Sequence, residues 1–447
     1  MKLWQKTTNS KQEVEQFTVG KDPEFDLLLA PYDVLGSMAH AAMLETIGLL
    51  TGEENKVLQQ GLKEIYEEIK QGKFGIELGV EDVHSQVELL LTKRFGDVGK
   101  KLHSGRSRND QVLVDLKLFY RDAIREIFDE VDSLANLLLQ LAEAHKEDLM
   151  PGYTHTQLAM PSSFGLWFAS FAEGLSEDLG LLQVAFELSN KNPLGSAAGY
   201  GSSFPLDRTM TTRLLGFAEL HHNVINAQNS RGKTERTIGF ALAGMAGTLN
   251  KLSSDVILFC NQHFGFVSFP DELTTGSSIM PHKKNPDVFE LIRAKTNQIQ
   301  SLPGTVGFLL TNLTSGYHRD MQLLKEAVFP ALDSMRSCLQ MSHFMLKSIQ
   351  VRKNILEDPF YMHLFSVEVV NELVLKGVPF RDAYKQVGED IEAKRFVPNQ
   401  EKISHSHEGS IGNLSLNEIR SKLEVAKAKF DFRAINQALD SLLNSSQ

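Results

Sequence analysis

Residues 106–150, RSRNDQVLVDLKLFYRDAIREIFDEVDSLANLLLQLAEAHKEDLM, contain neither glycine nor proline. Apolar residues recur in this stretch at steps of three and four, the spacing that places side chains on one face of an α-helix. The series consists of Leu116, Phe119, Ala123, Ile127, Val131, Leu134, Leu138 and Leu141. It predicts one helix of roughly 35–40 residues, about 55 Å long. A small domain cannot cover such a helix, so we expect a helix bundle that is shared between subunits.

The rest of the chain also has helical patterns. They cover residues 33–44, 55–71, 167–190, 234–264, 286–302, 322–347 and 416–443, with Pro330 as a predicted kink. Alternating segments are almost absent, so the predicted fold class is all-α, and a nucleotide-binding α/β enzyme is excluded. We expect an N-terminal helical domain in residues 1–105, a central long-helix bundle in 106–350, and a small helical C-terminal domain in 351–447.

Composition narrows the function classes. The chain has 447 residues and a formal net charge of −10 without a basic run, which argues against a nucleic-acid partner. Two cysteines, Cys260 and Cys338, exclude a disulfide framework and a cysteine-based metal cluster. The N-terminus has no apolar signal region, and no apolar run approaches transmembrane length. We therefore expect a cytoplasmic protein that does not interact with membranes.

The second informative stretch is residues 274–293, TTGSSIMPHKKNPDVFELIR. It is predicted to lead from a glycine and serine loop into a helix, with Asn285 as the N-cap and Pro286 at the first helical position. Ser277 offers a hydroxyl, and Lys283 brings positive charge close to it. This combination suits a reaction in which a proton leaves carbon and negative charge builds on a carboxylate. The alternative interpretation is a solvated connection between two helices.

The order of residues in this loop supports the chemical interpretation. Residues 276–286, GSSIMPHKKNP, resemble the signature loop of the fumarase/aspartase superfamily, whose members cleave C–N or C–O bonds and release fumarate. Four more segments resemble the argininosuccinate lyase family: HSGRSRNDQV at 103–112, GYTHTQ at 152–157, GSAAGYGSSFPLDR at 195–208 and SGYHRDMQLLKE at 315–326. The resemblance covers the chain from about residue 29 to residue 388. It implies β-elimination of argininosuccinate to arginine and fumarate, without a metal or organic cofactor.

The resemblance also implies roles for individual residues. Ser277 would be the base that removes the Cβ proton, and Lys283 and Asn285 would hold the carboxylate that takes up the charge. His155, next to Thr154, would pair with the carboxylate of Glu290. A histidine in this arrangement can move a proton or orient a water molecule. A lone histidine without the motif would more often be a core or capping residue.

The remaining assignments concern substrate binding. The resemblance implies that Ser107, Arg108 and Asn109 contact the substrate carboxylates, and that Tyr317, Gln322 and Lys325 hold the arginine-derived half. It also assigns Arg231 to a flexible loop, and Asp33 is a candidate partner for the guanidinium group. The long helices carry these polar stretches at their ends, which in one subunit lie far apart. We therefore expect active sites that are shared between the subunits of a homotetramer.

The sequence departs from the family pattern at three places. Residues 3–6, LWQK, replace a Trp-Gly-Gly-Arg-Phe opening, Gly232-Lys233 replace an acid and aromatic pair after Arg231, and residues 366–372 differ from the usual Ala-Thr-Asp-Leu-Ala. None of these changes affects the proposed base. Two alternatives stay open: another fumarate-releasing lyase, such as adenylosuccinate lyase, fumarase or aspartase, and a non-catalytic structural protein such as the lens crystallins of this family.

Overall fold

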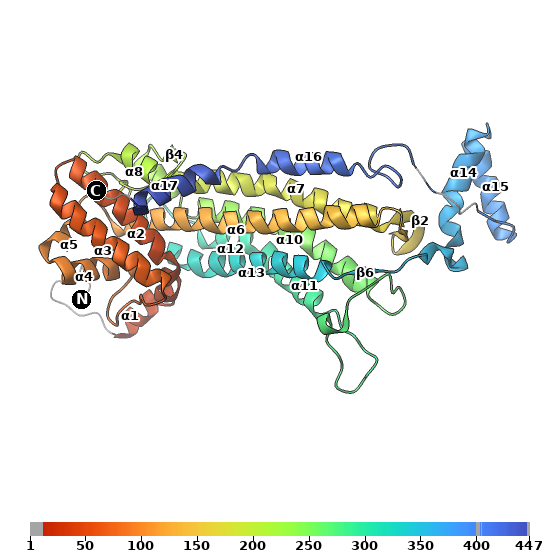
Figure 1. The fold of residues 1–447 in the computed structure, drawn as a ribbon, viewed down its shortest axis with the longest axis horizontal. Helices are drawn as coiled ribbons and strands as arrows, with labels where there is room; N and C mark the ends of the chain where they lie inside the picture. The colour runs from red at the N-terminus through yellow and green to blue at the C-terminus, as the bar shows by residue number, and fades with distance from the viewer. Residues whose placement is uncertain (1–11, 399–402, 404, 445–447) are drawn as a thin grey trace.

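A computed structural model describes residues 12–398, 403 and 405–444; the atypical residues 3–6 lie outside them. The molecule is elongated and is built around α6, Arg108–Ala144, a helix of 37 residues that confirms the prediction from the glycine-free stretch (Figure 1). Ser107 is the N-cap of α6. Its Oγ accepts a hydrogen bond from the Asn109 N–H at 3.3 Å, while the Asp110 carboxylate accepts the Ser107 N–H at 2.8 Å. This reciprocal capping explains why the helix starts there.

Five further helices complete the bundle around α6: α7 (Phe164–Ser189), α10 (Lys233–Phe259), α11 (Asp287–Gln300), α12 (Leu302–Leu309) and α13 (Leu323–Leu346, with Pro330 inside it). Their buried faces form one hydrophobic cluster that runs along the bundle and includes Leu116, Phe168, Leu242 and Leu339. Burial of such large aliphatic and aromatic side chains is the main stabilising contribution, at about 1.5–3 kcal/mol for each side chain.

The N-terminal end of the bundle carries a second hydrophobic cluster. It is formed mainly by α2 (Asp22–Thr46), α3 (Gly52–Lys70), α4 (Val83–Phe95) and α5 (Asp97–Lys101), together with α8 (Arg208–Leu214), whereas α1 (Gln12–Val19) and α9 (Val224–Asn229) are short. By length and composition α2 could cross a membrane, but 72% of its most apolar window is buried inside the protein. In this structure α2 is therefore a core helix of the second cluster.

Short strands are the main local difference from the prediction. Strands β1 (Leu149–Thr154) and β2 (Gln157–Ser163) form an antiparallel hairpin beyond the end of α6. Two small pairs join β3 (Lys191–Asn192) to β4 (Glu219–Leu220) and β5 (Val267–Ser268) to β6 (Gln350–Val351). Single 3-10 turns follow at η1 (Asp271–Leu273) and η2 (Arg319–Gln322). The other regular elements of the described chain are helices, so the all-α class is confirmed.

The expected C-terminal domain of residues 351–447 is not one packed unit in the described residues. The 3-10 helices η3 (Ile355–Glu357) and η4 (Pro359–Phe365) lead to α14 (Ser366–Leu375) and α15 (Phe380–Glu392), which share a small cluster of their own at the far end of the molecule (Figure 1). In contrast, α16 (Leu416–Lys427) packs on α7, and α17 (Phe432–Asn444) reaches α2 and α8. The chain thus returns along the whole bundle because the apolar faces of α16 and α17 complete its two main clusters.

The start of α11 also corrects the prediction. The helix begins at Asp287, with Pro286 in the N-cap position and without a side-chain cap. Asn285 does not cap it; its Nδ2 donates back to the carbonyl of Gly276 at 3.4 Å. Asn285 therefore closes the preceding loop and leaves the first N–H groups of α11 without a capping side chain.

Candidate active site

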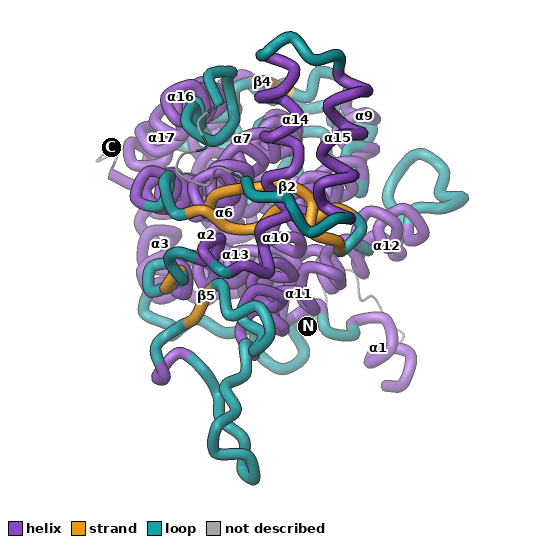
Figure 2. The backbone as a smooth tube through the Cα atoms, turned by 90° about the vertical axis from the view of Figure 1, so that its right-hand side faces the viewer, coloured by secondary structure: helices purple, strands orange, loops and turns teal. Residues whose placement is uncertain are grey.

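The signature loop, residues 275–286, stands away from the bundle between α10 and α11 (Figures 1 and 2). Its two ends are joined at the base, where the Asn285 N–H donates to the carbonyl of Thr275 at 2.8 Å. Lys283 is exposed and Asn285 is half-buried. In one protomer the loop therefore leaves the Lys283 side chain in solvent.

Ser277 has the most distinctive environment in this loop. Its side chain is half-buried, and its Oγ accepts the N–H groups of Ile279 at 3.3 Å and Met280 at 3.1 Å. The neighbouring Ser278 is exposed. Two converging backbone donors stabilise negative charge on an oxygen, so the geometry favours an alkoxide at Ser277.

His155 lies in the turn between β1 and β2, at the opposite end of α6 from the substrate-binding residues predicted near Ser107. His155 and Thr156 both have positive φ angles, 53° and 59°, in the turn that follows Thr154. Thr154 and His155 are exposed. In the described residues no hydrogen bond or ion pair links His155 to Glu290, which is exposed on α11. Their predicted pairing is therefore not made within one protomer.

Six of the predicted substrate-binding residues do come together. A cavity of about 130 Å³ is lined by Arg108, Asn109, Arg231, Tyr317, Gln322 and Lys325. These residues come from the N-terminal ends of α6 and α10 and from the segment around η2. The cavity lies where the N-terminal cluster meets the bundle, so α2 and the segment before α4 complete its wall.

Lys325 is 2% exposed and is held by two carboxylates of α2. Its Nζ lies 2.6 Å from Asp22 Oδ1 and 2.6 Å from Asp26 Oδ1. Burial raises the pKa of Asp22, although the Lys325 charge opposes this effect. Neither aspartate was predicted from the sequence as a site residue. The sequence feature that could have pointed to them is the helix start at Asp22-Pro23, because Asp22 and Asp26 lie one helical turn apart there.

Arg108 is paired with acidic residues in the cavity. Its Nη1 donates to Glu81 Oε2 at 2.8 Å, and its Nε lies 3.3 Å from Asp82 Oδ2. Burial would raise the pKa of Asp82, but the charges of His84 and Arg108 and the hydrogen bonds from Ser85 lower it below its usual value. A substrate carboxylate that reaches Arg108 would therefore compete with protein carboxylates.

Asp33 does not line this cavity. It is 2% exposed, and its Oδ1 lies 2.6 Å from Nδ1 of His84, which does line the cavity; Asp115 Oδ2 lies 3.5 Å from the same nitrogen. Burial opposes a charged His84, but the carboxylates of Asp33, Asp115 and Asp82 raise its pKa to about 10. Burial and the Asp33 charge raise the pKa of Asp115 well above its usual value.

One histidine and two carboxylates are also a possible ligand set for a cation. In the described residues, Asp33, His84 and Asp115 each place a ligand atom within 4.8 Å of the others. A metal ion requires a neutral imidazole, whereas these carboxylates favour the protonated form of His84. The charges of Asp33 and Asp115 also act on the buried Arg106 guanidinium and oppose the lowering of its pKa by burial. The donor set thus fits a proton better than a metal ion.

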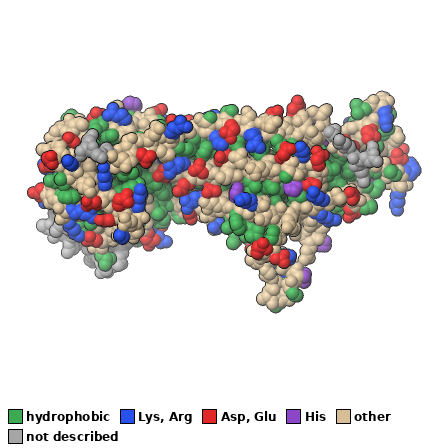
Figure 3. Space-filling view, in the orientation of Figure 1, with side chains coloured by type: hydrophobic (Ala, Val, Ile, Leu, Met, Phe, Trp, Pro, Cys, Tyr) green, Lys and Arg blue, Asp and Glu red, His purple; other side chains and the backbone are tan. Residues whose placement is uncertain are grey.

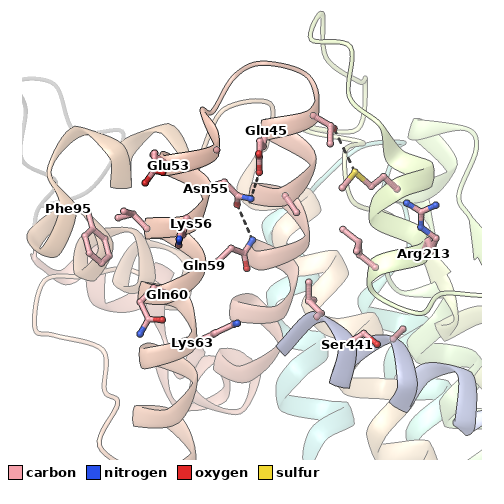
Figure 4. A pocket seen from close by; sticks show the side chains of 18 of the residues that line it. Glu45, Glu53, Asn55, Lys56, Gln59, Gln60, Lys63, Phe95, Arg213 and Ser441 are labelled. Atoms are coloured by element: carbon pink, nitrogen blue, oxygen red, sulfur yellow. Dashed lines mark hydrogen bonds between the residues drawn. The ribbon is translucent and has the colours of Figure 1, made fainter. Parts of the chain in front are cut away.

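A larger groove lies elsewhere in the N-terminal region. It measures about 1470 Å³ and is formed by α2, α3, α8 and α17 (Figure 4). Glu45, Asn55 and Gln59 form a hydrogen-bonded chain in it, in which Asn55 Nδ2 donates to Glu45 at 2.5 Å and Gln59 Nε2 donates to Asn55 at 3.1 Å. None of the predicted site residues lines this groove. Size alone is therefore a poor guide to the site in this protein.

The described structure thus contains three separate groups of predicted site residues: the cavity, the hairpin turn with His155, and the signature loop. α6 alone separates the cavity from the hairpin by about 55 Å. Within one protomer the three groups therefore do not form a single site.

Comparison with known structures confirms the fold. The crystal structure of EDDS lyase in complex with formate has a TM-score of 0.80, with 22% identity over 97% of this chain and 95% of that chain. A recombinant class II fumarase from Schistosoma mansoni has a TM-score of 0.70, with 15% identity over 92% and 94% of the two chains. A family described as Lyase matches residues 2–301. This family match makes the protein a lyase.

Sequence comparison is more specific. The chain is 58% identical to the argininosuccinate lyase of Bacteroides fragilis over 442 residues, which are 99% of each chain. It is 41% identical to that of Thermotoga neapolitana over 388 residues, or 87% of this chain and 98% of the relative. The chain belongs to the argininosuccinate lyase family.

Proposed function

We propose that this protein cleaves argininosuccinate by β-elimination to arginine and fumarate, with Ser277 as the base. The observation that carries the assignment of the base is the pair of backbone N–H groups directed at Ser277 Oγ. A serine hydroxyl is a weak base unless its alkoxide is stabilised by such donors and by nearby cations. Lys283 supplies a cation in the same loop.

In the proposed reaction the Ser277 alkoxide takes the proton from Cβ, next to a carboxylate of the succinyl half. The electrons of the C–H bond move into this carboxylate and form a dianionic aci-carboxylate. The electrons then return to form the C=C bond of fumarate as the C–N bond to the arginine half breaks, and the departing nitrogen takes up a proton. Each donor that holds the dianion contributes about 3 kcal/mol to the transition state. Lys283 and the amide of Asn285 are the proposed donors.

The departing nitrogen needs an acid on the other side of the substrate. We assign this side to His155 and Thr154, whose hairpin turn exposes both side chains. Glu290, on the exposed face of α11, would raise the basicity of His155 when another subunit brings them together. Direct proton donation by His155 and the orientation of a water molecule both fit this placement.

The cavity at the end of the bundle is the proposed site for the arginine-derived half. Tyr317, Gln322 and Lys325 are the proposed contacts to this half, and Asp22 and Asp26 hold Lys325 in place. Arg108, Asn109 and Arg231 would meet the carboxylates of the substrate. Ser107 supports them as the cap of α6, because its hydroxyl is already bonded to the Asn109 N–H.

We also propose a homotetramer in the cytoplasm. The bundle helices expose large apolar side chains, among them Leu181, Phe240, Leu291, Phe308, Met341 and Phe344, and Figure 3 shows hydrophobic patches among the charged groups of the bundle. Exposed apolar patches of this kind mark protein interfaces. The same association would bring the signature loop and the hairpin turn to the cavity of another subunit.

The test is fumarate release, followed by ultraviolet absorbance, with argininosuccinate, adenylosuccinate, malate and aspartate measured side by side. We expect rapid release from argininosuccinate alone. Release from one of the other substrates would assign a different fumarate-forming lyase activity. A folded oligomer that releases fumarate from none of them would favour a structural role.

A further inference from the structure

Arg231 enters the cavity from the turn that precedes α10. It is 4% exposed, its Nη2 donates to the carbonyl of Met321 at 3.2 Å, and its Cζ lies 5.4 Å from the ring centre of Tyr317. Met321 precedes Gln322, and both Tyr317 and Gln322 line the cavity. The direction of the Arg231 side chain therefore depends on how the chain turns into α10.

The turn itself is held by a carboxylate. Gly232 has a φ of +87°, and a Cβ at this position would lie 2.4 Å from Leu310 Cδ2, so only glycine fits. Its N–H donates to Glu235 Oε2 at 2.5 Å. This carboxylate belongs to the first turn of α10.

Glu235 is in turn held from α6. The Tyr120 hydroxyl donates to Glu235 Oε1 at 3.3 Å. One turn earlier, Lys117 Nζ donates to Thr234 Oγ1 at 2.6 Å and to the carbonyl of Leu188 at 2.7 Å. Lys117, Tyr120, Thr234 and Glu235 are each at most 2% exposed.

This burial is costly for the charged groups. Burial lowers the pKa of Lys117 to about 8, and the charge of Glu235 opposes that shift. A buried polar group costs free energy unless it forms hydrogen bonds. A network in which every buried polar group is hydrogen-bonded restricts the backbone to one geometry. The network therefore fixes the start of α10 relative to α6.

We propose that Glu235 is a positioning residue for Arg231: it fixes the Gly232 turn and so aims the Arg231 guanidinium into the substrate cavity, while Tyr120 and Lys117 hold Glu235 in place. This inference rests on the proposed function, because it takes Arg231 to be a substrate contact. A misdirected Arg231 would weaken substrate binding and leave the Ser277 chemistry unchanged.

Steady-state kinetics with argininosuccinate test this role through a double-mutant cycle. Glu235→Ala is expected to raise KM on the order of tenfold and to change kcat by less than about twofold, because an interaction that is removed equally from the substrate and transition-state complexes affects KM alone. Glu235→Gln keeps an oxygen that can accept the Gly232 N–H, so its KM should remain near the wild-type value. In the Arg231→Ala background, Glu235→Ala should produce no further rise in KM.

A matched control separates positioning from a general loss of stability. Asp178 accepts a hydrogen bond from Thr248 Oγ1 at 2.7 Å, which joins α7 to α10 away from the cavity. Asp178→Ala should lower Tm without raising KM. Tyr120→Phe removes only the hydrogen bond from the Tyr120 hydroxyl to Glu235 and should raise KM about twofold. In the Arg231→Ala background Tyr120→Phe should not raise KM further. It serves as the second variant if Glu235→Ala does not fold.

Three results would overturn the inference. A normal KM in folded Glu235→Ala, beside a raised KM in Arg231→Ala, would show that Glu235 does not direct Arg231. If Glu235→Ala and Arg231→Ala raised KM additively in the double mutant, this result would also show that Glu235 does not direct Arg231. A normal KM in Arg231→Ala would remove Arg231 from the proposed substrate site, and the positioning role would fall with it, while activity on argininosuccinate would still stand.

Discussion

His84 Nδ1 lies 2.6 Å from Asp33 Oδ1, and both side chains are buried; His84 lines the cavity, and Asp33 lies behind it. The contact joins α4 to α2, and Asp115, 3.5 Å from the same nitrogen, adds α6. Three helices that shape the cavity therefore meet at one protonated imidazole. The pair explains why Asp33 does not line the cavity although α2 does.

This pair predicts a dependence of stability on pH. The pKa of His84 is raised to about 10 by Asp33, Asp115 and Asp82 against the cost of burial, whereas an unfolded histidine titrates near 6.5. The folded state thus binds the proton more tightly. The stabilisation is complete below about pH 6.5 and is lost as the pH rises toward about 10.

We expect His84→Gln to be less stable than wild type by about 3 kcal/mol at pH 6, and the difference to shrink by pH 10. The measurement is thermal or denaturant unfolding of both proteins at pH 6, 8 and 10. Arg106 is present in both proteins, so its titration largely cancels in the difference. The Asp115 carboxyl feels the His84 charge, so His84→Gln raises the pKa of Asp115 further. A gap that stays constant across this range would contradict the assigned proton.

Asp33 and Asp26 should respond differently to the same substitution. Asp33→Asn should lower stability by about 3 kcal/mol with KM nearly unchanged, because it weakens a buried ion pair behind the cavity. Asp26→Asn should raise KM on the order of tenfold, because Asp26 lines the cavity and fixes Lys325. Unfolding curves and argininosuccinate kinetics for both variants would show the contrast, and the reverse pattern would refute the placement of Asp33.

Ser277→Ala should reduce kcat by at least about 10³-fold, because no other group in the loop receives the same two backbone donors. The matched control is Ser278→Ala, since Ser278 is the exposed neighbour. We expect the control to retain most of its activity in the fumarate assay. Equal losses in both variants would move the base elsewhere in the loop.

Lys283→Met should lower kcat by about 10²-fold if the lysine stabilises the dianionic intermediate. Lys284→Met is a suitable control because the Lys284 ammonium is paired with Asp271 at the base of the loop. Its effect should be limited to a small change in loop stability. Raised KM with unchanged kcat in Lys283→Met would assign that lysine to ground-state binding.

The separation of the loop from the cavity predicts complementation between inactive variants. Ser277→Ala and Lys325→Met should each be inactive alone, but mixed oligomers should regain activity in about a quarter of their sites, because each of two contributing subunits is the suitable variant half of the time. The variants are dissociated together, reassociated at equal amounts and assayed. Activity no higher than that of the separate variants would place both residues in one subunit.

Much of this architecture followed from local sequence. The 37-residue α6, the long bundle helices α7, α10, α11 and α13, and the loop with Ser277 were predicted, because helical periodicity and capping act between residues a few positions apart. The short helix α12 was not predicted. Six of the ten predicted substrate contacts lie around one cavity. The resemblance to a known family supplied the substrate, which no periodic pattern contains.

Tertiary structure decided the rest. Asp26 and Asp33 lie two turns apart on the same face of α2, yet the cavity wall ends between them. The return of α16 and α17 along the bundle likewise depends on apolar faces far apart in the chain. Sequence periodicity by itself determined which residues share a helix face. What packs against that face was decided by the folded chain, because hydrophobic burial is non-directional and pairs segments by shape rather than by distance in sequence.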